Sequence, residues 1–158
     1  MNIDNIYTMN NIYTINNNQI KFKNPSYILL VVSKYGIDKL FERLNEESNF
    51  DFYSINQNFV EYLIENGADI NYNNGNSITP LFVACHYNNK DILQSLIKYN
   101  VDINIMTNTG TTAMDIVYAN NNLDIANLLV DNGFDLYKDI DNEGSVFWKY
   151  MDLLLNTE

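Results

Sequence analysis

Apolar residues in the middle of the chain recur in short groups with helical spacing. Leu81, Ala84 and Cys85 fall at i, i+3 and i+4, which places them on one face of a short helix. Residues 92–97 carry a second apolar stripe of the same kind. Between the two groups stands Asn88-Asn89, and asparagine tolerates the left-handed conformation that a tight turn between helices requires. The pattern predicts a unit of two short helices joined by a turn.

Start and stop signals support the bounds of this unit. Thr79 can cap the first helix with its hydroxyl, and Pro80 then takes the first helical position, where its missing N–H costs nothing. Asn100 follows the second helix, in a position that Gly67 and Gly133 occupy in the neighbouring segments. Glycine and asparagine both accept left-handed geometry after a helix, so these positions are physically equivalent.

The unit repeats with a fixed period. Thr79-Pro80-Leu81 returns 33 residues later as Thr112-Ala113-Met114, and Asp69, Asp102 and Asp135 are separated by the same interval. We attribute the recurring aspartates to turn geometry rather than to catalysis. Because each unit buries only one face by itself, copies must stack on one another to form a continuous apolar core.

These residues resemble the ankyrin-repeat family. Residues 77–85 are similar to its consensus Gly-x-Thr-Pro-Leu-His-x-Ala-Ala, with Ser77 for Gly and Phe82 for His, and 102–104 match the Asp-Val-Asn that closes a repeat. The resemblance covers roughly residues 25–155. It implies an all-α ankyrin-repeat solenoid of stacked helix-turn-helix units joined by extended β-turn loops. It also implies that the protein is a binding module, without indicating what it binds.

The period divides the chain into expected segments. Residues 1–24 form either a hairpin, with 12–15 against 20–22, or a low-complexity tail. Residues 25–158 form the repeat domain, with an N-terminal cap unit (25–45), an irregular unit (46–71), two repeats (72–104 and 105–137) and a C-terminal cap (138–158). The irregular unit shows no Thr-Pro-Leu near Glu46, so we expect its first helix to be lost or remodelled.

Charge and composition limit the classes of partner and the locations that we expect for the protein. The chain has 20 acidic and 9 basic residues, a formal net charge of −11, which repels nucleic acid and favours a protein partner with a basic surface, or serves solubility alone. A single cysteine excludes an internal disulfide. With no apolar run long enough for a membrane span and no secretion signal, we expect no membrane contact and a cytoplasmic location, with delivery into another cell left open.

Candidate chemistry is sparse. Cys85 and His86 are neighbours on a helix, so their side chains point about 100° apart and cannot form a nucleophile–base dyad. We expect no metal site, no cofactor and no enzymatic activity. The alternative is a regulatory subunit or an enzyme with its site in the irregular segment 45–57, because loops that interrupt a scaffold carry function more often than the scaffold itself.

The resemblance to ankyrin repeats implies a concave groove lined by turn tips and first helices. Ile78 and Tyr87 are the expected anchors, since exposed apolar and aromatic side chains on a rigid scaffold contribute most to binding. Asp115 breaks the repeat, where Phe82 stands one period earlier, and is interpreted as a contact to a basic partner group or as sequence drift. Trp148 and Tyr150 are expected to be partly buried in the cap. The full set of expected partner-binding residues is Asn76, Ile78, His86, Tyr87, Asn108, Thr109, Thr111, Asn120, Asp141, Asn142 and Ser145.

Overall fold

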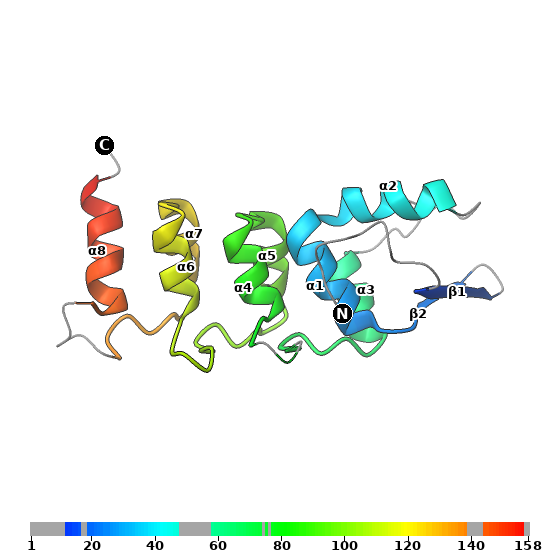
Figure 1. Cartoon of the computed structure of the whole chain (residues 1–158), viewed down its shortest axis with the longest axis horizontal. Coiled ribbons are helices and arrows are strands. Elements are labelled where there is room, and N and C mark those ends of the chain that lie inside the picture. The colour runs from blue at the N-terminus through cyan, green and yellow to red at the C-terminus, as the bar shows by residue number, and fades with distance from the viewer. Residues whose placement is uncertain are drawn as a thin grey trace.

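The computed structural model describes residues 12–16, 19–47, 58–73, 75, 77–138 and 144–156. Within them the chain forms a two-stranded sheet and eight helices, stacked along one axis (Figure 1). The elements are β1 (Tyr13–Asn16), β2 (Gln19–Phe22), α1 (Pro25–Tyr35), α2 (Ile37–Glu47), α3 (Phe59–Glu65), α4 (Pro80–His86), α5 (Lys90–Lys98), α6 (Ala113–Ala119), α7 (Leu123–Asp131) and α8 (Val146–Asn156).

The helices form a row of first helices with second helices packed beside them. In the first row α1 packs on α4, α4 on α6, and α6 on α8. The second helices α3, α5 and α7 each pack against the first helix of their own pair. One apolar core runs through the units and contains both Leu96 of α5 and Leu129 of α7, each fully buried. The predicted all-α stack of helix pairs is confirmed.

The predicted helix-start signals are confirmed. Thr79 Oγ1 accepts a hydrogen bond from the Phe82 N–H at 3.4 Å, and Pro80 is the first residue of α4. One period later Thr112 forms a capping box with Asp115, in which each side chain accepts from the other residue's backbone N–H. Side-chain acceptors thus satisfy N–H groups that a helix start leaves unpaired.

The turns use left-handed residues at the predicted helix ends. Asn100 has φ 61°, matching Gly67 and Gly133 at 89° and 94°. In the turn between α4 and α5 only Asn88 is left-handed, with φ 54°, whereas Asn89 has φ −84°. Of the two asparagines that could take this conformation, Asn88 does so, because a single left-handed residue suffices to reverse the chain here.

Hydrogen bonds between successive loops hold the units in register. Asn71 Oδ1 accepts from the Asp102 N–H at 2.9 Å. One period later Asn104 Oδ1 accepts from the Asp135 N–H at 2.8 Å, and its Nδ2 donates to the Gly133 carbonyl at 3.0 Å. Within each loop the aspartate side chain accepts from the N–H two residues on. The periodic aspartates and asparagines are thus explained by loop geometry, as expected.

The first unit contains an insertion. α1 packs against α3 and α4, so it takes the first-helix place of the pair that ends with α3. α2 lies between them in the sequence and extends along the stack axis, away from the neighbouring units (Figure 1). No separate first helix begins at Glu46, which lies in the last turn of α2. The expected division between residues 45 and 46 falls inside this insertion.

Hairpin and inserted helix together cover the N-terminal end of the stack. Tyr13 pairs with Phe22 across the antiparallel strands. Phe22, Phe41 of α2 and Phe59 of α3 are buried and meet edge to face, with ring centroids 5.7 and 4.8 Å apart. Of the two alternatives for residues 1–24, the paired strands of a hairpin are present at 13–16 and 19–22, and residues 1–11, 17 and 18 lie outside the described residues.

α8 closes the other end differently from the expectation. Leu153 is its one buried residue, at 2% exposure, and Tyr150 donates from its hydroxyl to Asn127 Oδ1 of α7 at 2.8 Å. Tyr150 is partly buried, as expected, whereas Trp148 is more open, at 51% exposure. Trp148 is exposed because it lies on the side of α8 that faces away from α6.

We predict that Asn104→Ala lowers the free energy of unfolding by about 1 kcal/mol, because two hydrogen bonds between units are lost. Urea denaturation measures the effect. Asn132→Ala is the matched control, since Asn132 Nδ2 donates only to the Leu128 carbonyl of its own helix, and we expect a loss below about 0.5 kcal/mol. Equal losses in the two variants would contradict a role for Asn104 in coupling the units.

Candidate functional site

The expected anchors lie at opposite ends of α4. Ile78 precedes the capping residue Thr79, whereas Tyr87 follows the last residue of the helix. With seven helical residues between the caps, about 10 Å of helix separates the two ends. Candidate contact residues therefore fall into two groups. We name them the tip row (Ile78, Asn108 and Thr109) and the helix-end row (Lys34, Tyr35, His86, Tyr87 and Tyr118).

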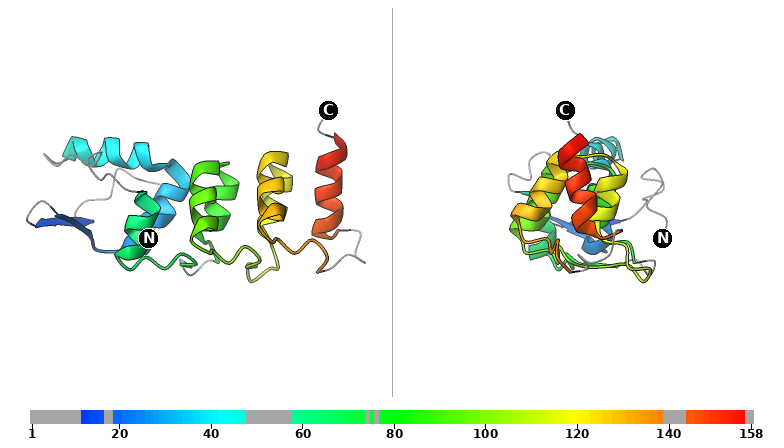
Figure 2. Two further views of the ribbon diagram at one scale, coloured as in Figure 1. Left: turned by 180° about the vertical axis from the view of Figure 1, so that it is seen from behind. Right: turned by 90° about the vertical axis from the view of Figure 1, so that its left-hand side faces the viewer.

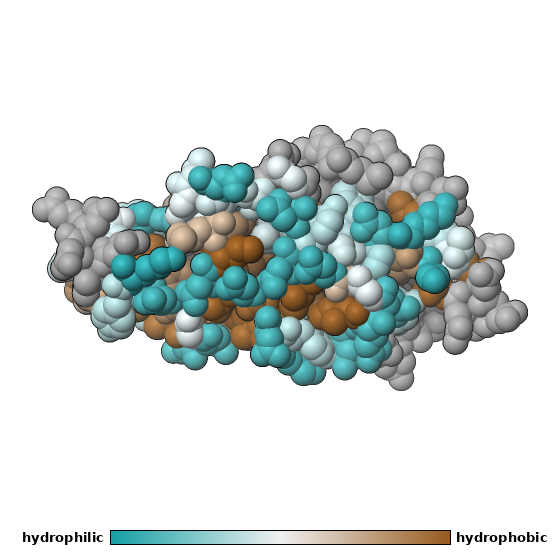
Figure 3. Space-filling view, turned by 90° about the horizontal axis from the view of Figure 1, so that it is seen from below, coloured by the Kyte–Doolittle hydropathy of each residue, from teal (hydrophilic) through white to brown (hydrophobic). Residues whose placement is uncertain are grey.

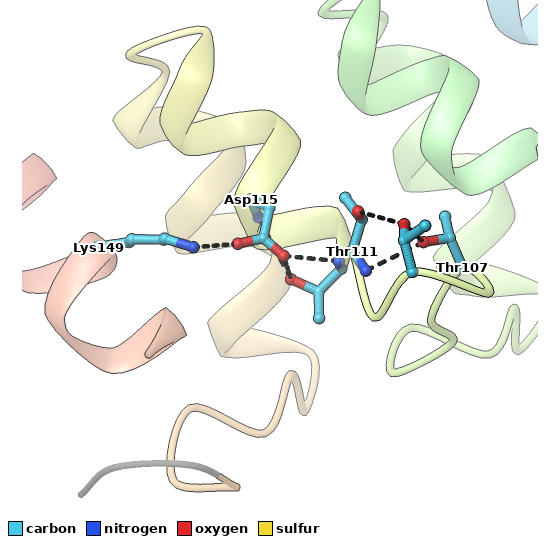
Figure 4. A network of polar contacts seen from close by, with 6 residues as sticks. Thr107, Thr111, Asp115 and Lys149 are labelled. Atoms are coloured by element: carbon cyan, nitrogen blue, oxygen red, sulfur yellow. Dashed lines mark hydrogen bonds and ion pairs between the residues drawn. The ribbon is translucent and has the colours of Figure 1, made fainter. Parts of the chain in front are cut away.

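Hydrogen bonds between neighbouring loops order the tip row. The Asn108 N–H donates to Ser77 Oγ at 3.4 Å, next to Ile78, which is 36% exposed. Within its own loop Thr109 Oγ1 shares hydrogen bonds with the hydroxyls of Thr107 and Thr111, at 2.9 and 3.2 Å (Figure 4). On this side, apolar surface alternates with hydrophilic side chains (Figure 3).

Thr111 is half-buried, and its N–H donates to Thr107 Oγ1 at 3.0 Å. Its polar groups are thus engaged within the loop. Thr111 holds the tip in shape, and the surface that a partner could reach is provided by Asn108 and Thr109, which are exposed.

An exposed aromatic residue is the centre of the helix-end row. Tyr87 is 46% exposed and meets His86 edge to face, with ring centroids 4.9 Å apart. Lys34 Nζ lies 5.0 Å from the ring centroids of both Tyr35 and Tyr87. A cation at this distance is attracted to the ring face, so α1 and α4 are linked at the surface as well as in the core.

Tyr118 extends the helix-end row onto α6. Its hydroxyl donates to Asp152 Oδ2 of α8 at 2.9 Å, and this hydrogen bond raises the pKa of the phenol. Sequence analysis missed Tyr118, although a signal was present: it stands one period after the buried Cys85, where a small residue is expected. It also missed Lys34 and Tyr35, because the insertion in the first unit hides their alignment with His86 and Tyr87.

Of the expected contact residues, one is hydrogen-bonded within the protein and one is buried. Asn120 Nδ2 donates to the carbonyls of Cys85 and His86, at 3.1 and 3.0 Å, and so fastens the end of α6 to the end of α4. Ser145 is 4% exposed. The Asn120 amide nitrogen is thus bonded within the protein, and stacking of the units buries the Ser145 side chain. Asn76, Asp141 and Asn142 lie outside the described residues.

Asp115 pairs with a cation of its own chain. One carboxylate oxygen accepts from the Thr112 N–H and hydroxyl, both at 2.7 Å, and the other forms an ion pair with Lys149 of α8 (Figure 4). Partial burial disfavours the charged form, but the hydrogen bonds from Lys149 and Thr112 outweigh it, and the pKa of Asp115 is lowered. The interpretation of Asp115 as a partner contact or as drift is therefore corrected: it links α6 to α8.

A hollow of about 360 Å³ lies beside this ion pair, between the loops and the start of α8. Its walls include Met106, Lys138 and Ser145 together with Asp115 and Lys149. Two of its charged groups, the Asp115 carboxylate and the Lys149 ammonium, already pair with each other. Within the described ranges, no group of three or more histidine, cysteine or carboxylate side chains is placed to hold a metal ion.

The thiol next to His86 is chemically quiet. Cys85 is fully buried, and burial raises the pKa of its thiol to about 12. It therefore remains protonated at neutral pH, when a nucleophilic cysteine must be a thiolate. His86 is exposed on the other side of the helix surface, as the expected angle between neighbouring helical residues requires. The predicted place of Cys85 on the apolar face of the first helix is confirmed.

Comparison with known proteins identifies the repeat. A family model described as ankyrin repeats (3 copies) matches residues 52–140, more than half of the chain. The chain belongs to the ankyrin-repeat family. A search of the curated proteins finds no match. Ankyrin repeats are generally protein–protein interaction modules and are typically non-catalytic. Across the described part of this ankyrin-repeat protein, no helix is both long and apolar enough to cross a bilayer.

We predict that Asp115→Asn destabilises the protein near neutral pH and loses this effect in acid. Because the folded pKa is lowered, the carboxylate stabilises the fold fully above the unfolded pKa of about 3.9 and loses its contribution as the pH falls through the folded value. Urea unfolding of wild type and variant between about pH 3 and pH 7 measures the difference, which should be largest above about pH 5.

Asp124→Asn is the control for this experiment. Asp124 forms an ion pair with Lys90 at 3.7 Å, but its side chain is 80% exposed, and exposed pairs contribute little. We expect a small, nearly constant difference for this variant. If the stability difference for Asp115→Asn did not close on acidification, its cause would lie in packing rather than in charge.

Proposed function

We propose that this ankyrin-repeat protein is a non-catalytic interaction module that binds another protein through the concave groove of turn tips and first helices. The observation that carries the proposal is the exposure of Ile78 and Tyr87 on a scaffold held by packed units and inter-loop hydrogen bonds. A preorganised surface loses little conformational entropy on binding, so exposed apolar side chains on it can contribute strongly to affinity.

Each row contributes a different kind of contact. The tip row offers the Ile78 side chain beside the polar groups of Asn108 and Thr109, which suits an extended backbone segment of the partner. The helix-end row offers aromatic faces, of which Tyr87 is the most exposed at 46%. Asn120 and Thr111 act as positioning residues for the two rows, since their polar groups are bonded within the protein.

The partner that fits this surface is basic. The chain has a formal net charge of −11 and an isoelectric point near 4.3. Such a field accelerates association with a positively charged protein surface and slows it with nucleic acid. Because the attraction is long-range, the association rate should fall as ionic strength rises.

The alternative function, a regulatory subunit or an enzyme with a site in the segment 45–57, rests on residues of which 48–57 lie outside the described part of the chain. The hollow beside Asp115 does not favour it, since the Asp115 carboxylate is already paired with Lys149. The interaction module is therefore the function we propose.

We predict that the double variant Ile78→Ala/Tyr87→Ala loses partner binding while its melting temperature stays within a few degrees of wild type, because both side chains are exposed. Quantitative affinity capture from extracts of the source cells, with the tagged protein as bait, measures the loss. Truncating anchors of this kind typically weakens binding by about tenfold or more.

Thr14→Ala/Ile15→Ala is the matched control, since it also truncates an exposed aliphatic side chain, on the hairpin and away from both rows. A genuine partner is captured by wild type and control but not by the double variant. Capture of the same proteins by all three baits would remove Ile78 and Tyr87 as anchors.

A further inference from the structure

The outer face of α8 is an uninterrupted apolar stripe. Its members are Phe147 and Met151, which are partly buried, together with the more exposed Trp148, Leu154 and Leu155. At about 100° per residue they fall within a third of the helix circumference, centred on Met151. Trp148, Leu154 and Leu155 are 51%, 42% and 74% exposed. No charged residue interrupts this face.

The opposite side of α8 is the one that packs on the preceding unit. Lys149 forms an ion pair with Asp115 of α6, and Leu153 is buried in the core. Asp152, at one edge, accepts the hydrogen bond from Tyr118. The apolar stripe therefore points out of the end of the stack, along its axis. Figure 2 views the molecule from this end in its right-hand panel, with α8 in front.

This face continues a kind of interface that the row of first helices already forms three times. α4 packs on α1 and is covered on its far side by α6, and α6 is covered in turn by α8. The far side of α8 is not covered within the described residues, as the exposure of its side chains shows. The other end of the stack is covered by the hairpin and α2 (Figure 2, left).

Terminal units of a repeat stack normally turn a polar face to water, because an apolar end associates with other surfaces. Here the terminal helix carries an aromatic cluster instead. The rings of Phe147 and Trp148 meet edge to face, with their centroids 5.2 Å apart. The ring of Tyr137, which is 66% exposed, has its centroid 5.8 Å from that of Phe147. The end of the stack formed by α8 is therefore apolar.

We propose that the outer face of α8 binds an amphipathic helix of a partner protein, which lies alongside α8 as the next first helix of the row and carries basic residues beside its apolar stripe. The occupant is a helix because it takes the next place in the row of first helices that ends with α8. Charge determines its polar side: the protein has a net charge of −11, and the exposed Asp152 carboxylate lies at the edge of the stripe. A second copy would instead bring two strongly acidic chains together.

The test uses Trp148, the only tryptophan of the chain, as a reporter at the site itself. The probe is a helical Leu/Lys peptide of about four turns without aromatic residues, added to the full-length protein. Burial of the half-exposed indole should shift its emission to shorter wavelength, with saturation. A peptide with Glu in place of Lys should bind about tenfold more weakly or worse.

Leu154→Glu/Leu155→Glu places two charges on the stripe and should abolish the shift. Thr14→Glu/Ile15→Glu adds the same two charges at exposed positions of the hairpin and should bind like wild type. The variant Ile78→Ala/Tyr87→Ala should also keep the shift, which separates this site from the groove of the proposed function. Far-ultraviolet circular dichroism of each variant checks that the fold is retained.

Three results would overturn the proposal. The first is the absence of any shift at millimolar Leu/Lys peptide. The second is equal binding to the Leu154→Glu/Leu155→Glu variant, which would mean attraction to the acidic protein as a whole. The third is a shift that follows protein concentration alone, with dimers in sedimentation velocity, which would mean that the face pairs with a second copy.

Discussion

Apolar contact between one helix pair and the next is the interaction on which the rest of the structure depends. Leu81, Leu93 and Leu96 of one unit and Met114 and Leu129 of the next are fully buried, although no single pair is large enough to enclose a core. At roughly 1.5–3 kcal/mol for each buried aliphatic side chain, the contacts across one interface are comparable with the whole net stability of a small domain, about 5–15 kcal/mol. The units are therefore stable only together.

Polar residues arrange the surface that this packing creates. Asparagine serves at Asn100 as a left-handed helix end and at Asn104 as a bridge between loops. These roles bring equivalent positions of successive units into line, which is why the tip row and the helix-end row exist as rows. A binding surface made this way is fixed before a partner arrives, because its side chains stand on backbone that the core already orders.

The N-terminal end of the stack is covered, whereas the C-terminal end exposes an apolar face, and this difference bears on the proposed functions. At the N-terminal end Phe22, Phe41 and Phe59 close the core beneath the hairpin and α2. At the C-terminal end Lys149 and Leu153 hold α8 on α6, while Trp148 and its neighbours face outward. A fold whose units are interchangeable can be extended at an open end, so the proposed helix-binding face and the proposed groove are separate surfaces with separate tests.

Much of the fold follows from the sequence, because the signals that define each repeat act between residues close together in the chain. Thr79 and Pro80 start a helix, Asn100 and Gly133 end one, and the spacing of apolar residues gives each helix its buried face; all of these act over a few residues and were predicted. The signal failed where the period was interrupted. Residues 36–58 separate α1 from α3, and a fixed interval cannot reveal that two helices so far apart form one pair.

The candidate site depends on contacts between units, which no local rule contains. Exposure of Ile78 and Tyr87 was predicted, but the ion pair of Asp115 with Lys149, the bonded state of Asn120 and the burial of Ser145 arise where one unit meets the next. The sequence by itself thus determined the repeating unit, its turns and its inward-facing side. Only the tertiary structure decided which polar side chains are bonded or buried between units and which apolar face of α8 is exposed to solvent. Both depend on which residues of the next unit pack against them.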